Sequence, residues 1–172
     1  MNFGESPRII VVGIGNLIHA DDGLGVHALE CLRRDPRLPE GVTLIDGGTF
    51  GLELLAYICD STHLLLLDAI DVGEPPGSLI RMEIEALRGL PGAASVHQVG
   101  LADLLATLPL VSSTSREIVL LGVQPLSTHW ATELSPHVKT SLAPLVDAAI
   151  AQLLDWVAKI RTQSLLCANV QG

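Results

Sequence analysis

The sequence predicts a single α/β domain in which helices cover both faces of a twisted, mostly parallel sheet. Apolar runs of strand length alternate along the 172 residues with segments of helical period, which is typical of layered α/β folds. The run at residues 8–12 is continuous and β-branched, as in a central strand that is buried on both faces. A chain of this length, 48% hydrophobic, buries enough surface to fold as one unit. We assign residues 1–160 to the domain and residues 161–172 to a flexible C-terminal tail.

Five segments are predicted as strands because each is a short apolar run next to turn residues. The first run ends at Gly13, and the second ends at Gly47-Gly48. The third contains four consecutive leucines, and the fourth follows a Glu-Pro-Pro-Gly turn. The predicted strands are residues 8–12, 42–46, 63–68, 78–82 and 117–123.

Segments with apolar residues at three- and four-residue intervals separate or follow these strands, and we predict them as helices. Thr49 is a candidate N-cap for the second helix. Ser135-Pro136 is a good start for the last helix, and Pro144 inside its pattern predicts a kink or a new start near Ser141. The predicted helices are residues 21–34, 49–59, 99–108 and a long last helix that reaches residue 160.

Composition and charge exclude several classes of protein. The chain has 10 basic and 19 acidic side chains, a formal charge of −9, and its few basic residues are scattered. Binding nucleic acid takes a basic stripe, so we expect a protein or small-molecule partner instead. No apolar run reaches the length of a membrane span, the start of the sequence lacks the pattern of a secretory signal, and three cysteines without CxxC spacing favour reduced thiols. We therefore expect a cytoplasmic protein.

Polar residues and glycines collect in the loops that follow the predicted strands. Ligands of open α/β sheets bind at the carboxyl ends of the strands, where these loops meet. Acidic side chains converge on this edge from several strands. The loops concerned are residues 13–25, 46–49, 68–71 and 95–98.

The first of these loops begins like a dinucleotide-binding fingerprint but does not complete it. The third glycine of that motif would fall at Ile18, and Asp21 and Asp22 stand where a pyrophosphate needs bare N–H groups. This makes a nucleotide-binding domain an unfavoured alternative. Gly13 and Gly15 are explained equally well by a tight turn with close backbone approach.

Asp22 and Asp68 are the carboxylates that sequence reasoning favours for chemistry. Asp21 and Asp22 both stand at a predicted helix start, where simple capping is an alternative explanation, most of all for Asp21. Asp68 ends a strand of four leucines, and a carboxylate there is costly unless it is paired, hydrogen-bonded or bound to a cation. Asp46 occupies the same place one strand over, but its Gly-Gly-Thr neighbours favour a structural Asx turn.

His97 is the third candidate, because it precedes a helix at the same edge of the sheet. A lone histidine is more often structural than a ligand. Two carboxylates and one imidazole at one edge, however, are typical of a metal site with open positions rather than a closed structural site. The sequence therefore favours Asp22, Asp68 and His97 as a common site.

Five blocks of sequence, in order and spacing, resemble the NiFe-hydrogenase maturation endopeptidases, which process the C-terminus of the hydrogenase large subunit. The match runs from about Arg8 to Trp156. The blocks are GIGNLIHADDGLGV from Gly13, DGGT from Asp46, LDAID from Leu67, SVHQVGLAD from Ser95 and LGVQP from Leu121.

The resemblance implies a fold, an activity and a set of site residues. The family fold is a three-layer αβα sandwich of phosphorylase/hydrolase-like type, and its members remove a short C-terminal extension from the large-subunit precursor after nickel insertion. The resemblance places the catalytic and metal-contacting roles on Asp22, Asp68 and His97. Some members carry Glu where this chain has Asp22, so the carboxylate here is one methylene shorter.

Nickel is implied as the metal, and it is expected to arrive with the substrate. Two carboxylates and an imidazole offer nickel no thiolate, and none of the three cysteines lies near the candidate loops. In the family picture the softer ligands are cysteines of the large subunit itself. The precursor is then the partner, and its nickel serves as a recognition tag.

The sequence leaves the mechanism open. Known serine, cysteine and zinc protease motifs are missing, which leaves attack by water assisted either by the metal or by Asp22 and Asp68 as base and acid. The alternative function is a non-catalytic nickel-sensing or chaperone-like module for the same precursor. Leu17, Ile18, Phe50 and Leu52 are a candidate docking surface, with ordinary loop packing as the other explanation. We expect a monomer.

Overall fold

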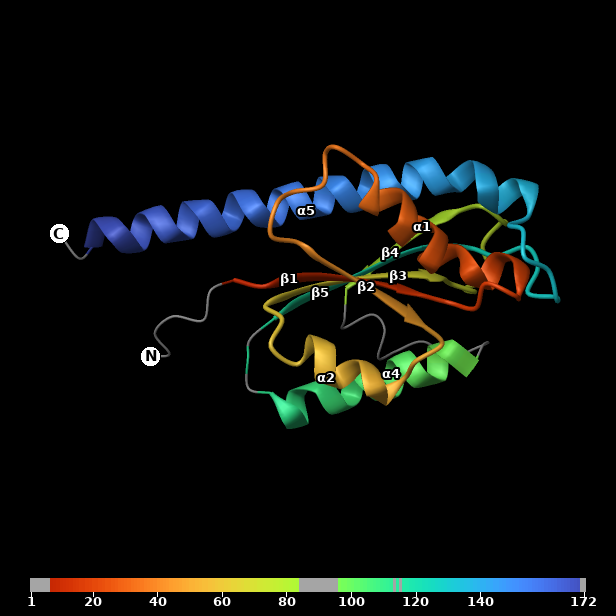
Figure 1. The fold of residues 1–172 in the computed structure, drawn as a ribbon, viewed down its shortest axis with the longest axis horizontal. Helices are drawn as coiled ribbons and strands as arrows, with labels where there is room; N and C mark the ends of the chain where they lie inside the picture. Colours follow the sequence, from red (N-terminus) through yellow and green to blue (C-terminus); the bar gives the residue numbers. More distant parts are fainter. Residues whose placement is uncertain (1–6, 84–95, 113, 115, 171–172) are drawn as a thin grey trace.

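The computed structural model describes residues 7–83, 96–112, 114 and 116–170, and it contains a five-stranded sheet in the order β2-β1-β3-β5-β4 (Figure 1). Four strands are parallel and β4 pairs antiparallel with β5, which confirms the predicted mostly parallel sheet. The strands are β1 (Ile9–Ile14), β2 (Thr43–Gly48), β3 (His63–Ala69), β4 (Leu79–Glu83) and β5 (Glu117–Val123).

Helices cover both faces of the sheet, which makes the predicted three layers. Figure 1 shows α1 (Leu24–Arg33) and α5 (Pro136–Val170) on one face, with α2 (Leu55–Ile58) and α4 (Val96–Val111) on the other. Successive side chains of a strand point to opposite faces, so the buried residues divide into two cores. Leu65 and Leu67 of β3 pack with α1 and α5, whereas Leu64 and Leu66 pack with α2 and α4.

The helices begin and end at residues that differ from the predicted ones, mainly near the carboxyl edge of the sheet. The first helix begins at Leu24, after a 3₁₀ turn η1 (Ala20–Gly23), rather than at residue 21. The second is reduced to η2 (Leu52–Leu54) followed by α2, and Gly51 rather than Thr49 precedes it as the capping residue. Contacts with residues 126–135, described below, hold Ala20 and Asp21 in the 3₁₀ turn.

α5 is one continuous helix. The N–H of Val138 donates to Ser135 Oγ at 3.5 Å and that of Lys139 donates to the Ser135 carbonyl at 2.8 Å, so the predicted start is confirmed. Pro144 lies inside the helix, and of the two predicted outcomes, a kink or a new start near Ser141, the new start does not occur. Beyond residue 160, where the sequence predicted a tail, helix continues to Val170. The boundary of the domain there stays a prediction.

The length and composition of α5 have a packing explanation. Among the described helices, the segment Pro136–Leu166 of α5 contains an 18-residue stretch of mean hydropathy 1.3, so it matches a membrane span by length and composition alone. Leu145, Ala149, Leu153 and Trp156 are buried in the core that α5 forms with the sheet and α1. The apolar face of this helix therefore fits a core helix.

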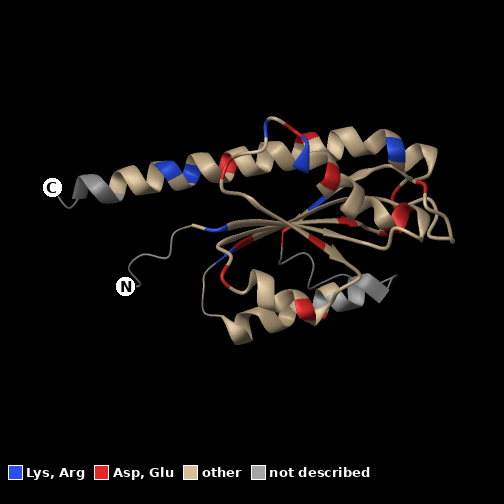
Figure 2. Cartoon of the chain, viewed as in Figure 1, with Lys and Arg blue, Asp and Glu red and all other residues tan. Residues whose placement is uncertain are grey.

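Figure 2 shows the basic residues as short, separated segments, which agrees with the absence of a basic stripe from the sequence.

The stability of the fold is expected to depend on pH through His63. Burial, opposed by Glu117 and helped by Lys159, lowers the pKa of His63 below 6.5, and its ring lies 5.1 Å from that of the buried Trp156. Unfolding restores the usual pKa, so this contribution to stability is full above pH 6.5 and declines as the pH falls below it. We expect the melting temperature of His63→Gln to fall less between about pH 7.5 and about pH 5.5 than that of wild type. The exposed His137→Gln is the control and should follow wild type.

Candidate active site

Glycines let the loop after β1 pack directly on the ends of the strands. A Cβ on Gly13 would lie 2.5 Å from the carbonyl oxygen of Gly25, and a Cβ on Gly25 would overlap the carbonyl of Leu67 in β3. Gly15 has φ +137°, and a Cβ there would overlap the carbonyl of Asp22. The predicted tight turn with close backbone approach is therefore confirmed. The turn places η1 directly against β3.

Asp22 and Asp68 lie on these two contacting elements and are both buried. Asp22, in η1, is 7% exposed, and its Oδ2 accepts a hydrogen bond from the N–H of Asn16 at 3.2 Å. Asp68, in β3, is 1% exposed, and its Oδ1 accepts from the N–H of Ala69 at 2.8 Å. The structure therefore brings the two predicted carboxylates to one edge of the sheet on neighbouring elements. Backbone N–H groups orient both.

The direction of Asp68 follows from the pleat of β3. Asp68 is two residues after Leu66 and four after Leu64, so it shares the strand face of these two leucines, which belong to the core packed by α2 and α4. Its side chain therefore leaves the sheet on the α4 side. Figure 1 shows α4 beginning at the end of the sheet toward which the parallel strands point.

His97 is the second residue of α4, so the backbone places it in the first turn of that helix. Its side chain lies outside the described part of the structure. Among the described residues, no three His, Cys, Asp or Glu side chains are grouped to hold a metal ion. The three-residue site of Asp22, Asp68 and His97 therefore stays a prediction.

Asp21 has a different role from the capping considered for it. It is fully buried, the N-cap position of η1 is His19, and the side-chain hydrogen bonds of Asp21 go to another loop. Its Oδ2 accepts from the N–H groups of Leu126 at 2.9 Å and Ser127 at 3.0 Å, and its Oδ1 accepts from that of Ser135 at 2.6 Å. Asp21 therefore ties the β1–α1 loop (residues 15–23) to the β5–α5 loop (residues 124–135).

The two loops are joined at further points. The N–H of Ala20 donates to the carbonyl of Ala131 at 2.7 Å, and the N–H of Ala131 donates to the carbonyl of Ile18 at 3.2 Å. The rings of His19 and Trp130 lie 4.6 Å apart. Ala20 has φ +46°, an uncommon conformation for a residue with a side chain, and these contacts hold it there. The β1–α1 and β5–α5 loops are therefore hydrogen-bonded to each other next to Asp22.

Exposed apolar side chains lie on these two loops and on the segment that follows β2. The four residues predicted as a docking surface are 44% to 60% exposed, so part of each side chain is available for contact, and their role in docking stays a prediction. The structure adds two that sequence reasoning missed, including Trp130, which is 77% exposed despite its contact with His19. We call this set the apolar rim: Leu17, Ile18, Phe50, Leu52, Leu126 and Trp130.

Two further polar residues at this edge are structural. Asp46 Oδ1 accepts from the N–H of Gly48 at 3.0 Å, which confirms the predicted Asx turn. Gln124, 5% exposed, accepts from the N–H groups of Val72 at 2.9 Å and Glu74 at 3.2 Å through Oε1. Its place in the LGVQP block gave no indication of this role. Gln124 fixes the loop that follows Asp68 and β3.

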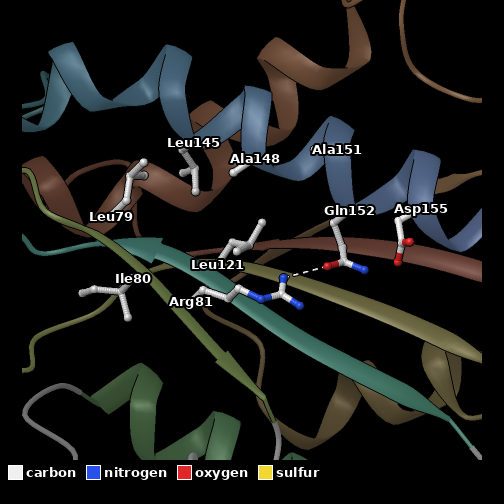
Figure 3. A pocket seen from close by; sticks show the side chains of 9 residues that line it. All are labelled: Leu79, Ile80, Arg81, Leu121, Leu145, Ala148, Ala151, Gln152 and Asp155. Carbon is white, nitrogen blue, oxygen red and sulfur yellow. Dashed lines mark hydrogen bonds between the residues drawn. The ribbon is translucent and has the colours of Figure 1, made fainter.

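A pocket of about 400 Å³ lies away from these residues, between β4, β5 and α5 (Figure 3). Its apolar floor includes Leu121 and Leu145, and Arg81 Nη1 donates to Gln152 Oε1 at 2.6 Å across it. Leu121 belongs to the core on the α5 side of the sheet. This pocket is therefore on the face opposite to the side chain of Asp68.

The family model described as hydrogenase maturation protease matches residues 26–152, well over half of the chain. The chain belongs to the hydrogenase maturation protease family. The curated family relative "Hydrogenase 2 maturation protease" of Escherichia coli strain K12 is 37% identical over 122 residues, which cover 70% of this chain and 74% of the relative. The family resemblance noted in the sequence is therefore confirmed.

Other members of the family are also similar to this chain in sequence and in fold. "Hydrogenase expression/formation protein HupM" of Azotobacter chroococcum mcd 1 is 41% identical over 124 residues, which cover 71% of this chain and 59% of the relative. Across seven curated relatives the match spans 56% to 65% of their length. The solved structure of the hydrogenase maturating endopeptidase HybD from E. coli superposes with a TM-score of 0.80 at 34% identity, covering 86% of this chain and 93% of HybD. The family fold is therefore the fold of this chain.

Proposed function

We propose that this chain is an endopeptidase that removes the C-terminal extension of the nickel-loaded large-subunit precursor of a NiFe hydrogenase. The observation that carries the proposal is the placement of two buried carboxylates, Asp22 and Asp68, at one edge of the sheet beside an exposed apolar rim. Relatives from E. coli bear the names hydrogenase 2 maturation protease and hydrogenase maturating endopeptidase. Buried carboxylates beside an apolar docking surface suit a hydrolase whose substrate is a folded protein.

Nickel enters this proposal as part of the substrate. The donors assigned to the protein are the carboxylates of Asp22 and Asp68 and the imidazole of His97, which leave coordination positions for cysteines of the precursor. Cys59 lies at the opposite edge, since its carbonyl accepts from Arg116, which precedes β5. Cys31 lies near the end of α1, which leads away from the carboxyl edge. Neither thiol competes for the metal.

Two routes for cleavage are compatible with this site. Nickel held between precursor and protease can act as a Lewis acid on the scissile carbonyl or on water. In the other route, Asp22 and Asp68 act as general base and general acid on the attacking water. Both routes need Asp68, but only recognition through the metal makes a nickel-free precursor dock poorly. We favour recognition through the metal.

The test is to incubate the purified protein with nickel-loaded precursor and with nickel-free precursor and to follow the mass of the large subunit. We expect shortening of the loaded precursor alone, with binding of the nickel-free form weakened at least about tenfold. The alternative, a non-catalytic nickel-sensing or chaperone-like module, predicts binding of the loaded precursor without a change of mass. We further propose that the protein is a cytoplasmic monomer, which sedimentation and cell fractionation test.

The apolar rim is expected to contribute to docking through Trp130. Large aromatic side chains dominate the energetics of protein interfaces, and Trp130 is exposed while its ring contacts that of His19 in a tilted arrangement. We expect Trp130→Ala to raise the KM for the loaded precursor about tenfold and to change kcat less than about threefold. Tyr57→Ala, which removes an exposed aromatic ring on α2, is the matched control and should keep the wild-type KM. Equal KM values for the two variants would remove Trp130 from the docking surface.

A further inference from the structure

The β5–α5 loop has to be held in place by contacts outside itself. It links β5 to α5 without a helix or strand of its own, apart from the bridge between His19 and Ala131. Loops of this length without secondary structure are uncommon in compact domains and are often functional. The contacts that fix the shape of the β5–α5 loop therefore also affect the candidate site beside it.

Asp21 provides the most concentrated of these contacts. Its carboxylate accepts three backbone N–H groups, from Leu126, Ser127 and Ser135, and its own N–H donates to the carbonyl of Ser127 at 3.1 Å. The three donors come from both ends of the β5–α5 loop. Hydrogen bonds to an ionised carboxylate are roughly twice as strong as neutral ones. The buried side chain of Asp21 therefore holds the start and the end of the β5–α5 loop close together.

We call the hydrogen bonds from Leu126, Ser127 and Ser135 to the Asp21 carboxylate the clamp. The clamp is next to the candidate site because Asp21 precedes Asp22 in the sequence. Asp22 is the next residue of the same 3₁₀ turn, and its carboxylate accepts from Asn16 on the β1–α1 loop. Trp130 and Leu126 of the apolar rim belong to the clamped loop. A displacement of the β5–α5 loop therefore separates rim residues from the segment that carries Asp22.

We propose that Asp21 is a positioning residue, which holds the β5–α5 loop against η1 so that the apolar rim and Asp22 meet the precursor as one preformed surface. The inference rests on the proposed function for its substrate, but the clamp itself can be measured without substrate. Without the clamp, only the fraction of molecules with a docked loop binds productively, and the apparent affinity falls by that fraction.

Two variants remove the clamp from opposite sides. Asp21→Asn keeps the size of the side chain but replaces one accepting oxygen with a donor, so that it opposes at least one of the three N–H groups. Ser127→Pro leaves Asp21 intact and removes one of its donors. Asp147→Asn, which makes the same chemical change at an exposed carboxylate paired with Arg37, is the control.

The measurements are hydrogen exchange of residues 124–135 and steady-state processing of the nickel-loaded precursor, on variants shown to be folded by their melting curves. We expect Asp21→Asn and Ser127→Pro to accelerate exchange in this loop at least about tenfold, with α1 unaffected, and the control to match wild type. We expect both variants to raise KM about tenfold with kcat changed less than about threefold.

The exchange and processing measurements test the clamp, the positioning role of Asp21 and the proposed function separately. Wild-type exchange in residues 124–135 of Asp21→Asn overturns the clamp, and a loss confined to kcat overturns the positioning role. If wild type fails to shorten the precursor, the proposed function fails, whereas the exchange measurement still decides whether Asp21 holds the loop. Recovery of slow exchange and low KM in Asp21→Glu relative to Asp21→Asn supports the role of the carboxylate.

Discussion

Asp68→Asn is expected to abolish processing of the nickel-loaded precursor, with a rate at least about a thousandfold below wild type. The amide keeps the shape of the side chain and an oxygen that accepts from the N–H of Ala69. It carries no charge, cannot act as a general acid or base, and is a poor ligand for a divalent cation. Both routes of cleavage therefore lose their essential group. Mass measurement of the large subunit under single-turnover conditions follows the loss.

Two controls separate this result from a failure to fold. Because Asp68 is buried at the end of β3, the melting temperature of Asp68→Asn is measured beside its activity. Asp46→Asn makes the same change in the exposed Asx turn of the next strand but one, where the amide oxygen still accepts from Gly48, and should process at the wild-type rate. A folded Asp68→Asn protein that processes within about tenfold of wild type contradicts a catalytic or metal-binding role for Asp68.

The strands at the candidate site follow from local sequence, because a strand buried on both faces needs a continuous apolar run. The four leucines of β3 and the β-branched run of β1 are such runs, and they lie side by side in the sheet. The glycines at Gly13 and Gly15 were predicted to allow close backbone approach, and the structure confirms this with backbone atoms where a Cβ would lie. The strands and the glycine turn can be predicted because each has a local sequence signal, although the backbone atoms that the glycines approach lie further along the chain.

The roles of Asp21 and the β5–α5 loop do not follow from local sequence. The hydrogen bonds of Asp21 join residues that are 105 to 114 positions apart, so a paired aspartate at a helix start looked like a cap. Trp130 lies in a segment without periodicity and gave no signal of its place on the rim. The start of α1 was misplaced for the same reason, since contacts from the distant loop hold residues 20–23 in a 3₁₀ turn. Long-range pairing decides these features.

Gly25→Ala is expected to lower the free energy of unfolding by about 3 kcal/mol, because a Cβ here enters space held by backbone. A Cβ on Gly25 would overlap the carbonyl oxygens of Leu67 in β3 and Ile14 in β1. Both carbonyls are backbone groups that cannot rotate away as a side chain can, so the overlap is removed only if α1 moves away from the sheet. Helix propensity alone predicts the opposite sign, a gain of up to about 1 kcal/mol for alanine at a helical position. The overlap is the larger effect, and urea unfolding measures the balance.

Gly73→Ala is the control that separates overlap from backbone conformation. Gly73 has φ +78° and no atom within 4 Å of a Cβ, so alanine there should cost only about 1 kcal/mol, the strain of a left-handed residue. A Gly25→Ala protein as stable as wild type would mean that α1 adjusts without cost, and that the close contact with β3 does not define the site. If the overlap moves α1, η1 moves with it, and Gly25→Ala should also lose processing activity at temperatures where it remains folded. The close approach that only glycine permits is then what brings Asp22 to the end of the strand that carries Asp68.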